Sequence, residues 1–163
     1  MSRPPLLSEL DPTTQRGLAA GLYNLTWTLL EQDDRSPADV DRMIHAAHAS
    51  RFHWDVIGLP VNRARGEWLC SRVYAVLGRG EPALWHARRC LEILEAGGEG
   101  IEDWDLPAAF EALARAHAVA GQRDEADAWQ SRARESLARV ADAEDREPIE
   151  GDLATLPDQR APS

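Results

Sequence analysis

The sequence predicts an all-α fold: a stack of about three antiparallel helical hairpins, six main helices in all, followed by a short C-terminal capping helix. Apolar residues recur at three- and four-residue steps along most of the 163 residues, which is the spacing of one helix face. Glycine and proline interrupt these runs, and such short connections make consecutive helices antiparallel neighbours. Alanine, leucine, arginine and glutamate are abundant, which also favours helices.

The clearest hairpin lies at residues 60–96, and its pattern is sharpest from residue 66 onward. Gly78 ends the first helix, because glycine tolerates the left-handed conformation that closes a helix. Pro82 then falls in the first turn of the second helix, where proline is well tolerated. The apolar stripe of that second helix consists of Leu84, Ala87, Cys90, Leu91 and Leu94.

A second copy of this hairpin covers residues 105–140, and Gly121 repeats Gly78 at a distance of 43 residues. The two copies resemble the tetratricopeptide repeat (TPR), whose pattern is W-x2-L-G-x2-Y followed by A-x3-F. The positions that fit are Tyr74, Ala83, Phe110, Leu113 and Ala126, and those that depart are Glu67, Cys70, Ala87, His117 and Gln130. The closing proline is missing from both copies, and a glycine-rich loop at 97–100 lengthens the period. The resemblance implies a degenerate TPR-like stack.

A first, more divergent hairpin is expected at residues 13–57. Asp11 and Pro12 form a helix start, with aspartate as the cap and proline in the first turn, and that helix should run to about Gln32. Ser36-Pro37-Ala38-Asp39 is a second helix start, for a helix that extends to about Trp54. Three hairpins satisfy the minimum for a stable repeat stack.

The two chain ends are expected to behave differently from the hairpins. We predict a single domain over residues 1–157 and a disordered tail at 158–163. The N-terminal residues form an irregular arm whose leucines, Leu6, Leu7 and Leu10, can dock on the body. Ile149, Leu153 and Leu156 indicate a short helix that caps the stack.

The composition and net charge indicate which classes of partner to expect. The net charge of −10 and the pI near 4.9 argue against nucleic acid and favour a protein or peptide partner. A signal peptide, a membrane span and a disulfide framework are not expected, so a cytoplasmic location is the default. All 18 basic residues are arginine, which indicates a GC-rich, bacterial source.

No motif for catalysis or for cofactor binding occurs in the sequence. It contains no nucleophile elbow, phosphate loop or dinucleotide fingerprint, so a non-enzymatic protein without a cofactor is expected. Cys70 and Cys90 fall at inward repeat positions and are expected to be buried, unreactive thiols.

His45 and His48 are the only candidates for a metal site, because their three-residue spacing places them on one helix face. A third ligand would come from His53, from Glu67 or from elsewhere in the chain. The structural alternative, which we favour, is that His45 forms hydrogen bonds inside the hairpin while His48 and His53 lie near a helix end, where the helix dipole favours histidine.

The candidate binding face is the concave side of the stack, which the first helix of each hairpin would line. The expected inward residues are Tyr23, Trp27, Arg65, Trp68, Arg72, Glu111 and Arg115. Aromatic residues and arginine are enriched in binding hot spots, so we predict a peptide- or protein-interaction module. In that reading the arginines meet acidic groups of the partner. Three alternatives remain: residues that merely pack within the stack, a metal- or small-molecule-binding protein using His45 and His48, and a self-associating homodimer.

Overall fold

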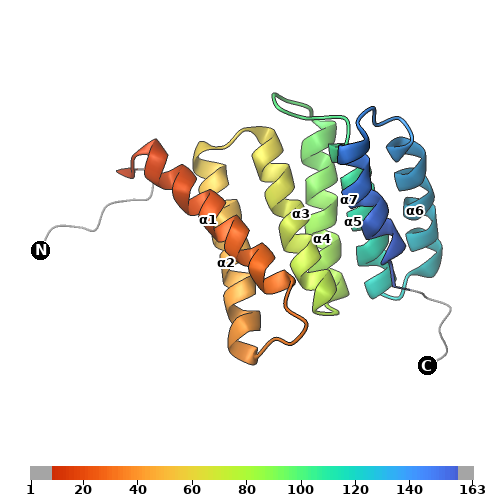
Figure 1. Cartoon of the computed structure of the whole chain (residues 1–163), viewed down its shortest axis with the longest axis horizontal. Coiled ribbons are helices and arrows are strands. Elements are labelled where there is room, and N and C mark those ends of the chain that lie inside the picture. Colours follow the sequence, from red (N-terminus) through yellow and green to blue (C-terminus); the bar gives the residue numbers. More distant parts are fainter. Residues whose placement is uncertain (1–8, 158–163) are drawn as a thin grey trace, which may run out of the picture.

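The computed structural model describes residues 9–157, where the chain forms seven helices and no strand (Figure 1). The predicted all-α class is therefore confirmed. The predicted tail at 158–163 and two leucines of the N-terminal arm, at positions 6 and 7, lie outside the described residues. The helices are α1 (Pro12–Leu30), α2 (Pro37–Ile57), α3 (Pro60–Val76), α4 (Gly80–Glu95), α5 (Asp105–Val119), α6 (Arg123–Leu137) and α7 (Ala143–Ala154).

The first six helices form three hairpins that follow one another along the long axis of the molecule (Figure 1). Each hairpin pairs an odd-numbered helix with the next one, and α2 packs on α3 as α4 packs on α5. The helices α1, α3 and α5 also touch in succession, so the first helices of the hairpins share one side. None of the helices described between residues 9 and 157 has the length and apolar character that crossing a membrane requires.

The helix boundaries follow the local signals in the sequence. The Asp11 side chain accepts a hydrogen bond from the Thr14 amide at 3.0 Å and caps α1. Ser36 and Asp39 form a reciprocal capping box at the start of α2. The helix α1 ends two residues before the predicted Gln32, and α2 continues three residues beyond Trp54. Gly78, with φ 70°, closes the turn between α3 and α4 as predicted.

The core is divided into two clusters. The larger one joins the second and third hairpins with α7, through residues such as Leu91, Leu113 and Leu153. The smaller one joins the first hairpin to α3, around Met43 and Leu69. Small residues make up much of the larger cluster, and they let neighbouring helices approach closely. The expected burial of both cysteines is confirmed, with Cys70 0% and Cys90 2% exposed.

The helix α7 lies across α5 (Figure 1). Ile149 and Leu153 are buried, which confirms the capping helix predicted from the sequence. Pro148 lies inside this 12-residue helix, where it removes one backbone donor. Such a helix is weak by itself, so its stability comes from what it packs against.

Replacing Leu113 by alanine tests the hairpin register. Leu113 is 1% exposed on α5, so we expect Leu113→Ala to lower the free energy of unfolding by about 2–5 kcal/mol through the cavity it leaves. Urea denaturation measures the change. Leu106→Ala, on the same helix but at a position 38% exposed, is the control and should cost much less. Equal losses in the two variants would contradict the register.

A second prediction concerns the close approach of α4 to the end of α5. A Cβ atom on Gly80 would lie 2.7 Å from the Cα atom of Ala120, a backbone atom that cannot rotate away. We expect Gly80→Ala to destabilise the protein by about 1–3 kcal/mol. Gly21→Ala, where nothing lies within 4 Å, should instead stabilise α1 by about 0.5–1 kcal/mol. Thermal unfolding of the two variants should therefore shift in opposite directions.

Candidate functional site

Contacts across three helices link five of the seven residues of the predicted binding face, namely Trp27, Trp68, Arg72, Glu111 and Arg115. Trp27 of α1 meets Trp68 of α3, with ring centroids 5.7 Å apart and a tilt of 30°. The Arg72 guanidinium lies over the Trp68 ring, 5.0 Å from its centroid. Arg72 also reaches Glu111 of α5 at 3.3 Å. The face is thus continuous from the first hairpin to the third.

The helix α7 covers the part of this face that belongs to the third hairpin. Arg115 donates to the backbone oxygens of Asp152, at 2.7 Å, and of Thr155, at 3.2 Å. It also donates to the Thr155 hydroxyl at 3.0 Å. The Asp152 carboxylate forms an ion pair with Arg72 at 2.7 Å. The acidic groups expected from a partner are therefore supplied here by the chain itself.

Glu111 is the buried centre of this arrangement, with 1% of its surface exposed. Arg115 approaches one of its oxygens at 2.7 Å, and Arg72 lies 3.3 Å from the other. Burial raises the pKa of the Glu111 carboxyl, and the positive charges of Arg72 and Arg115 oppose that rise. The two arginines thus satisfy a carboxyl group that water does not reach.

The other part of the face remains open beside the first hairpin. Tyr23, Arg65 and Trp68 line a cavity of about 90 Å³ together with Trp104 and Cys90. A wider hollow of about 310 Å³ adjoins it, because Tyr23, Arg65 and Trp104 line both. Its remaining lining residues are Ala20, Asn24, Trp54 and Asn62. We call this pair of spaces the aromatic groove.

Arg65 is held rigidly at the border of the aromatic groove. Its Nε and Nη2 atoms each donate to the Asp105 carboxylate at 2.9 Å, which is the bidentate geometry of a strong pair. Its guanidinium also lies 4.3 Å from the centroid of the Trp104 ring. The charge of Arg65 is therefore neutralised within the chain, and the groove offers aromatic surface more than positive charge.

One polar atom at this site has no partner. Among the described residues, the indole nitrogen Nε1 of Trp68 is the only buried side-chain nitrogen or oxygen without a hydrogen bond. A buried N–H group without an acceptor costs about 1–3 kcal/mol. Tyr23 lies in the same groove, and burial raises the pKa of its phenol, so it stays neutral at physiological pH.

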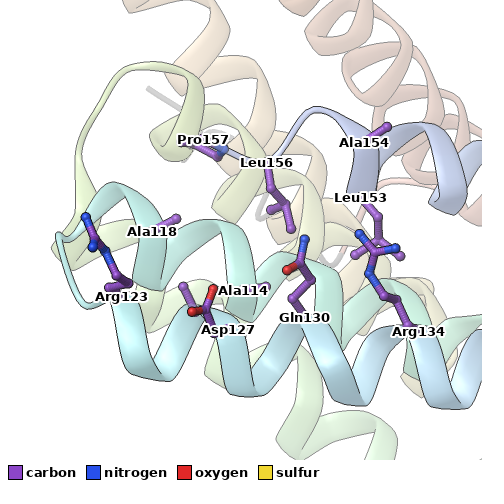
Figure 2. A pocket seen from close by; sticks show the side chains of 11 residues that line it. Ala114, Ala118, Arg123, Asp127, Gln130, Arg134, Leu153, Ala154, Leu156 and Pro157 are labelled. Atoms are coloured by element: carbon purple, nitrogen blue, oxygen red, sulfur yellow. The ribbon is translucent and has the colours of Figure 1, made fainter. Parts of the chain in front are cut away.

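A larger hollow lies between α5, α6 and α7, with a volume of about 390 Å³ (Figure 2). Figure 2 shows Gln130 and Arg134 of α6 on one side, and Leu153 and Leu156 on the other. An adjoining hollow of about 480 Å³ shares Arg134 and Leu153 with it. Two arginines and one acidic residue border each of these hollows.

The structure separates the histidines that the sequence grouped together. His45 is exposed on α2, so the expectation that it points inward to form hydrogen bonds within the hairpin is wrong. His53 is buried near the end of α2, and its Nδ1 lies 2.6 Å from Gln15 Oε1. His48 lies in the middle of the helix rather than at its end, with its Nε2 atom 2.9 Å from the Tyr74 hydroxyl.

The cluster around His48 draws on two further helices. His48, Cys70 of α3 and His86 of α4 each place one donor atom within 4.8 Å of the others. Tyr74 stacks on the His86 ring at 5.7 Å and 7°. His86 Nδ1 lies 2.6 Å from Glu67 Oε2.

Burial sets the protonation of this cluster. It raises the pKa of the Cys70 thiol to about 12 and, at His48, lowers the pKa of the imidazole. The thiol is therefore neutral at physiological pH. Burial raises the pKa of Glu67, but hydrogen bonds from His86 and Arg51 and the Arg51 charge outweigh this effect and lower it overall. Glu67 is an ionised acceptor between α2 and α4.

The sequence pattern missed three residues of these sites. His86 lies beside the apolar stripe of α4 and meets His48 across 38 residues of chain, which no local spacing reveals. From the sequence alone, Trp104 can equally be a residue that only fills a gap between hairpins. Asp152 lies in the segment for which the sequence predicted only a short capping helix. Arg65 lies on α3 and Trp104 directly precedes α5, so no local sequence signal links the two residues.

No model of a known protein family matches this chain, and no curated protein or solved structure does either. The geometry of the face and of the histidine cluster therefore carries the functional interpretation.

The contacts of Arg115 predict what holds α7 in place. Arg115→Gln removes charged donors to Asp152 and Thr155, each worth about 1.5–3 kcal/mol. We expect amide hydrogen exchange in α7 to accelerate about 10- to 100-fold, while α3 and α4 stay protected. Arg139→Gln, an exposed arginine just before α7, is the matched control. Unchanged exchange in α7 would show that apolar packing alone retains the helix.

Proposed function

We propose that the protein is a non-enzymatic, TPR-like interaction module that holds a peptide segment of a partner protein in the aromatic groove. The peptide would place an apolar side chain in the cavity between Tyr23 and Trp104. One of its carbonyl oxygens would accept the indole N–H of Trp68. This is the extended-peptide mode of recognition, in which side-chain pockets give specificity and main-chain groups add affinity.

The observation that carries this proposal is the unpaired indole nitrogen of Trp68. Buried polar groups in folded proteins have partners in the large majority of cases, so this orphan donor, on a residue that lines the groove, is the group that a peptide carbonyl would satisfy once the side chains around it move apart. The residues around it supply large, rigid contact area at low entropic cost, as Tyr and Trp do in binding hot spots.

The size and charge of the groove define the anchor. Its inner cavity of about 90 Å³ is smaller than the ~150 Å³ cavities that admit benzene, so the anchor is aliphatic rather than aromatic. Asp105 already neutralises Arg65, and Glu111 and Asp152 already pair with Arg72. These arginines therefore shape the face, and an acidic anchor has no unpaired arginine among them to meet.

The architecture supports the same function. Three hairpins in series place α1, α3 and α5 on one side, which matches the arrangement that the TPR resemblance implies. The first helices α1 and α3 and the start of α5 supply most of the groove's lining, and Trp54 of α2 and Cys90 and Leu94 of α4 complete it. A peptide bound there would lie against the first helices of the hairpins, next to the part of them that α7 covers.

The test compares two conservative tryptophan variants. Peptides enriched on the wild-type protein from a random display library would be measured by calorimetry against Trp68→Phe and Trp129→Phe. Trp129 packs on Phe110, with ring centroids 5.6 Å apart, and lies outside the aromatic groove. We expect Trp68→Phe to weaken binding about 3- to 10-fold, which corresponds to one hydrogen bond, and Trp129→Phe to leave it unchanged.

Enriched peptides should share an aliphatic residue, and replacing it by glycine should abolish binding. A failure to enrich any sequence, or equal binding by both variants, would contradict the groove. Sedimentation of the unliganded protein at two concentrations separates the alternative, a homodimer, from a peptide-binding monomer.

A further inference from the structure

We propose that His48, Cys70 and His86 form a Zn²⁺-binding site between α2, α3 and α4, with a fourth coordination position open to water or an exogenous ligand. This site is separate from the aromatic groove: none of the three residues belongs to the seven residues of the face, and none lines either space of the groove. It therefore does not depend on the proposed peptide binding.

The first argument is the convergence of three ligand side chains from three helices. One donor atom of each lies within 4.8 Å of the other two. Zinc bonds of ~2.0–2.1 Å to nitrogen and ~2.3 Å to sulfur place two tetrahedral nitrogen ligands and one sulfur ligand about 3.3–3.6 Å apart. The donors thus need to close by about 1 Å, a movement that side-chain rotation supplies without a change in the helices.

The second argument is the way the two imidazoles are held. Glu67 accepts from one nitrogen of His86 at 2.6 Å, and Arg51 in turn donates to Glu67 at 2.8 Å. Metal-bound histidines characteristically have their second nitrogen bonded to a carboxylate, which fixes the tautomer and the ring orientation. The nitrogen that remains on His86 is Nε2. His48 likewise has one nitrogen bonded, to the Tyr74 hydroxyl, and one remaining.

The third argument is the chemistry of the set. Two imidazoles and one thiolate are the nitrogen and sulfur ligands that zinc prefers, and three protein ligands leave one position open. Cys70 would release its thiol proton to solvent when the ion binds. The His48 and His86 rings lie 5.2 Å apart, and both residues are partly exposed, so the two imidazoles are accessible from the surface.

The experiment titrates the chelator-treated, full-length protein with Co²⁺, a spectroscopic substitute for zinc. We expect one equivalent to produce a thiolate-to-cobalt charge-transfer band and tetrahedral ligand-field bands, and Zn²⁺ to displace them. Cys70→Ala should abolish the charge-transfer band, whereas Cys90→Ala, the other buried cysteine, should retain it. His86→Gln and His48→Gln should each weaken binding at least 10-fold, and the exposed His45→Gln should not.

Glu67→Gln provides a check that does not remove a ligand. Loss of the carboxylate behind His86 should weaken Co²⁺ binding about 10- to 100-fold while the charge-transfer band keeps its position. Circular dichroism checks that each variant folds. If Cys70→Ala does not fold, the variants of the two partly exposed histidines still test the site. The proposal is overturned by an octahedral cobalt spectrum, by the absence of saturable binding, or by loss of the band in Cys90→Ala but not in Cys70→Ala.

Discussion

The structure depends on how one buried carboxylate is satisfied. Glu111 lies in the middle of α5 with 1% of its surface exposed, and a carboxylate in such a place destabilises a protein unless it is paired. Arg72 and Arg115 provide the pairing, and their remaining donors reach α7. A single charge thus fixes α3 against α5 and determines where the C-terminal helix docks. Apolar contacts of Ile149 and Leu153 complete the docking.

A second polar network links α2 to α3 and α4. Arg51, Glu67 and His86 form a chain of hydrogen bonds centred on the Glu67 carboxylate, and Tyr74 stacks on His86 and forms a hydrogen bond with His48. The two networks lie on different layers: one among the first helices of the hairpins, the other where α2 and α4 meet α3. The face and the histidine cluster therefore rest on separate polar networks, since the residues of each form hydrogen bonds with different neighbours.

The helices were predictable because their signals are local. The cap at Asp11, the capping box at Ser36 and the turn at Gly78 each act over three or four residues, and the helices begin and end close to them. The set of residues on the first helices was also predictable, because helical periodicity places Trp68 and Arg72 on one side. The partners of those residues were not, since Asp152 and Trp104 come from other segments and only the tertiary packing brings them near. The same reason separated His48 from His45 and joined it to His86.

The surroundings of Trp68 affect its fluorescence. Its ring contacts Trp27 on one side and the Arg72 guanidinium on another, and Arg72 is tied to Asp152 on α7. An indole in such surroundings exchanges excitation energy with its aromatic neighbour and shifts its emission when the adjacent charge moves. The protein thus carries an internal fluorophore at the junction of its first hairpin, its central hairpin and its C-terminal helix. Because the chain contains six tryptophans, the contribution of Trp68 is the difference between the emission of the wild-type protein and that of Trp68→Phe.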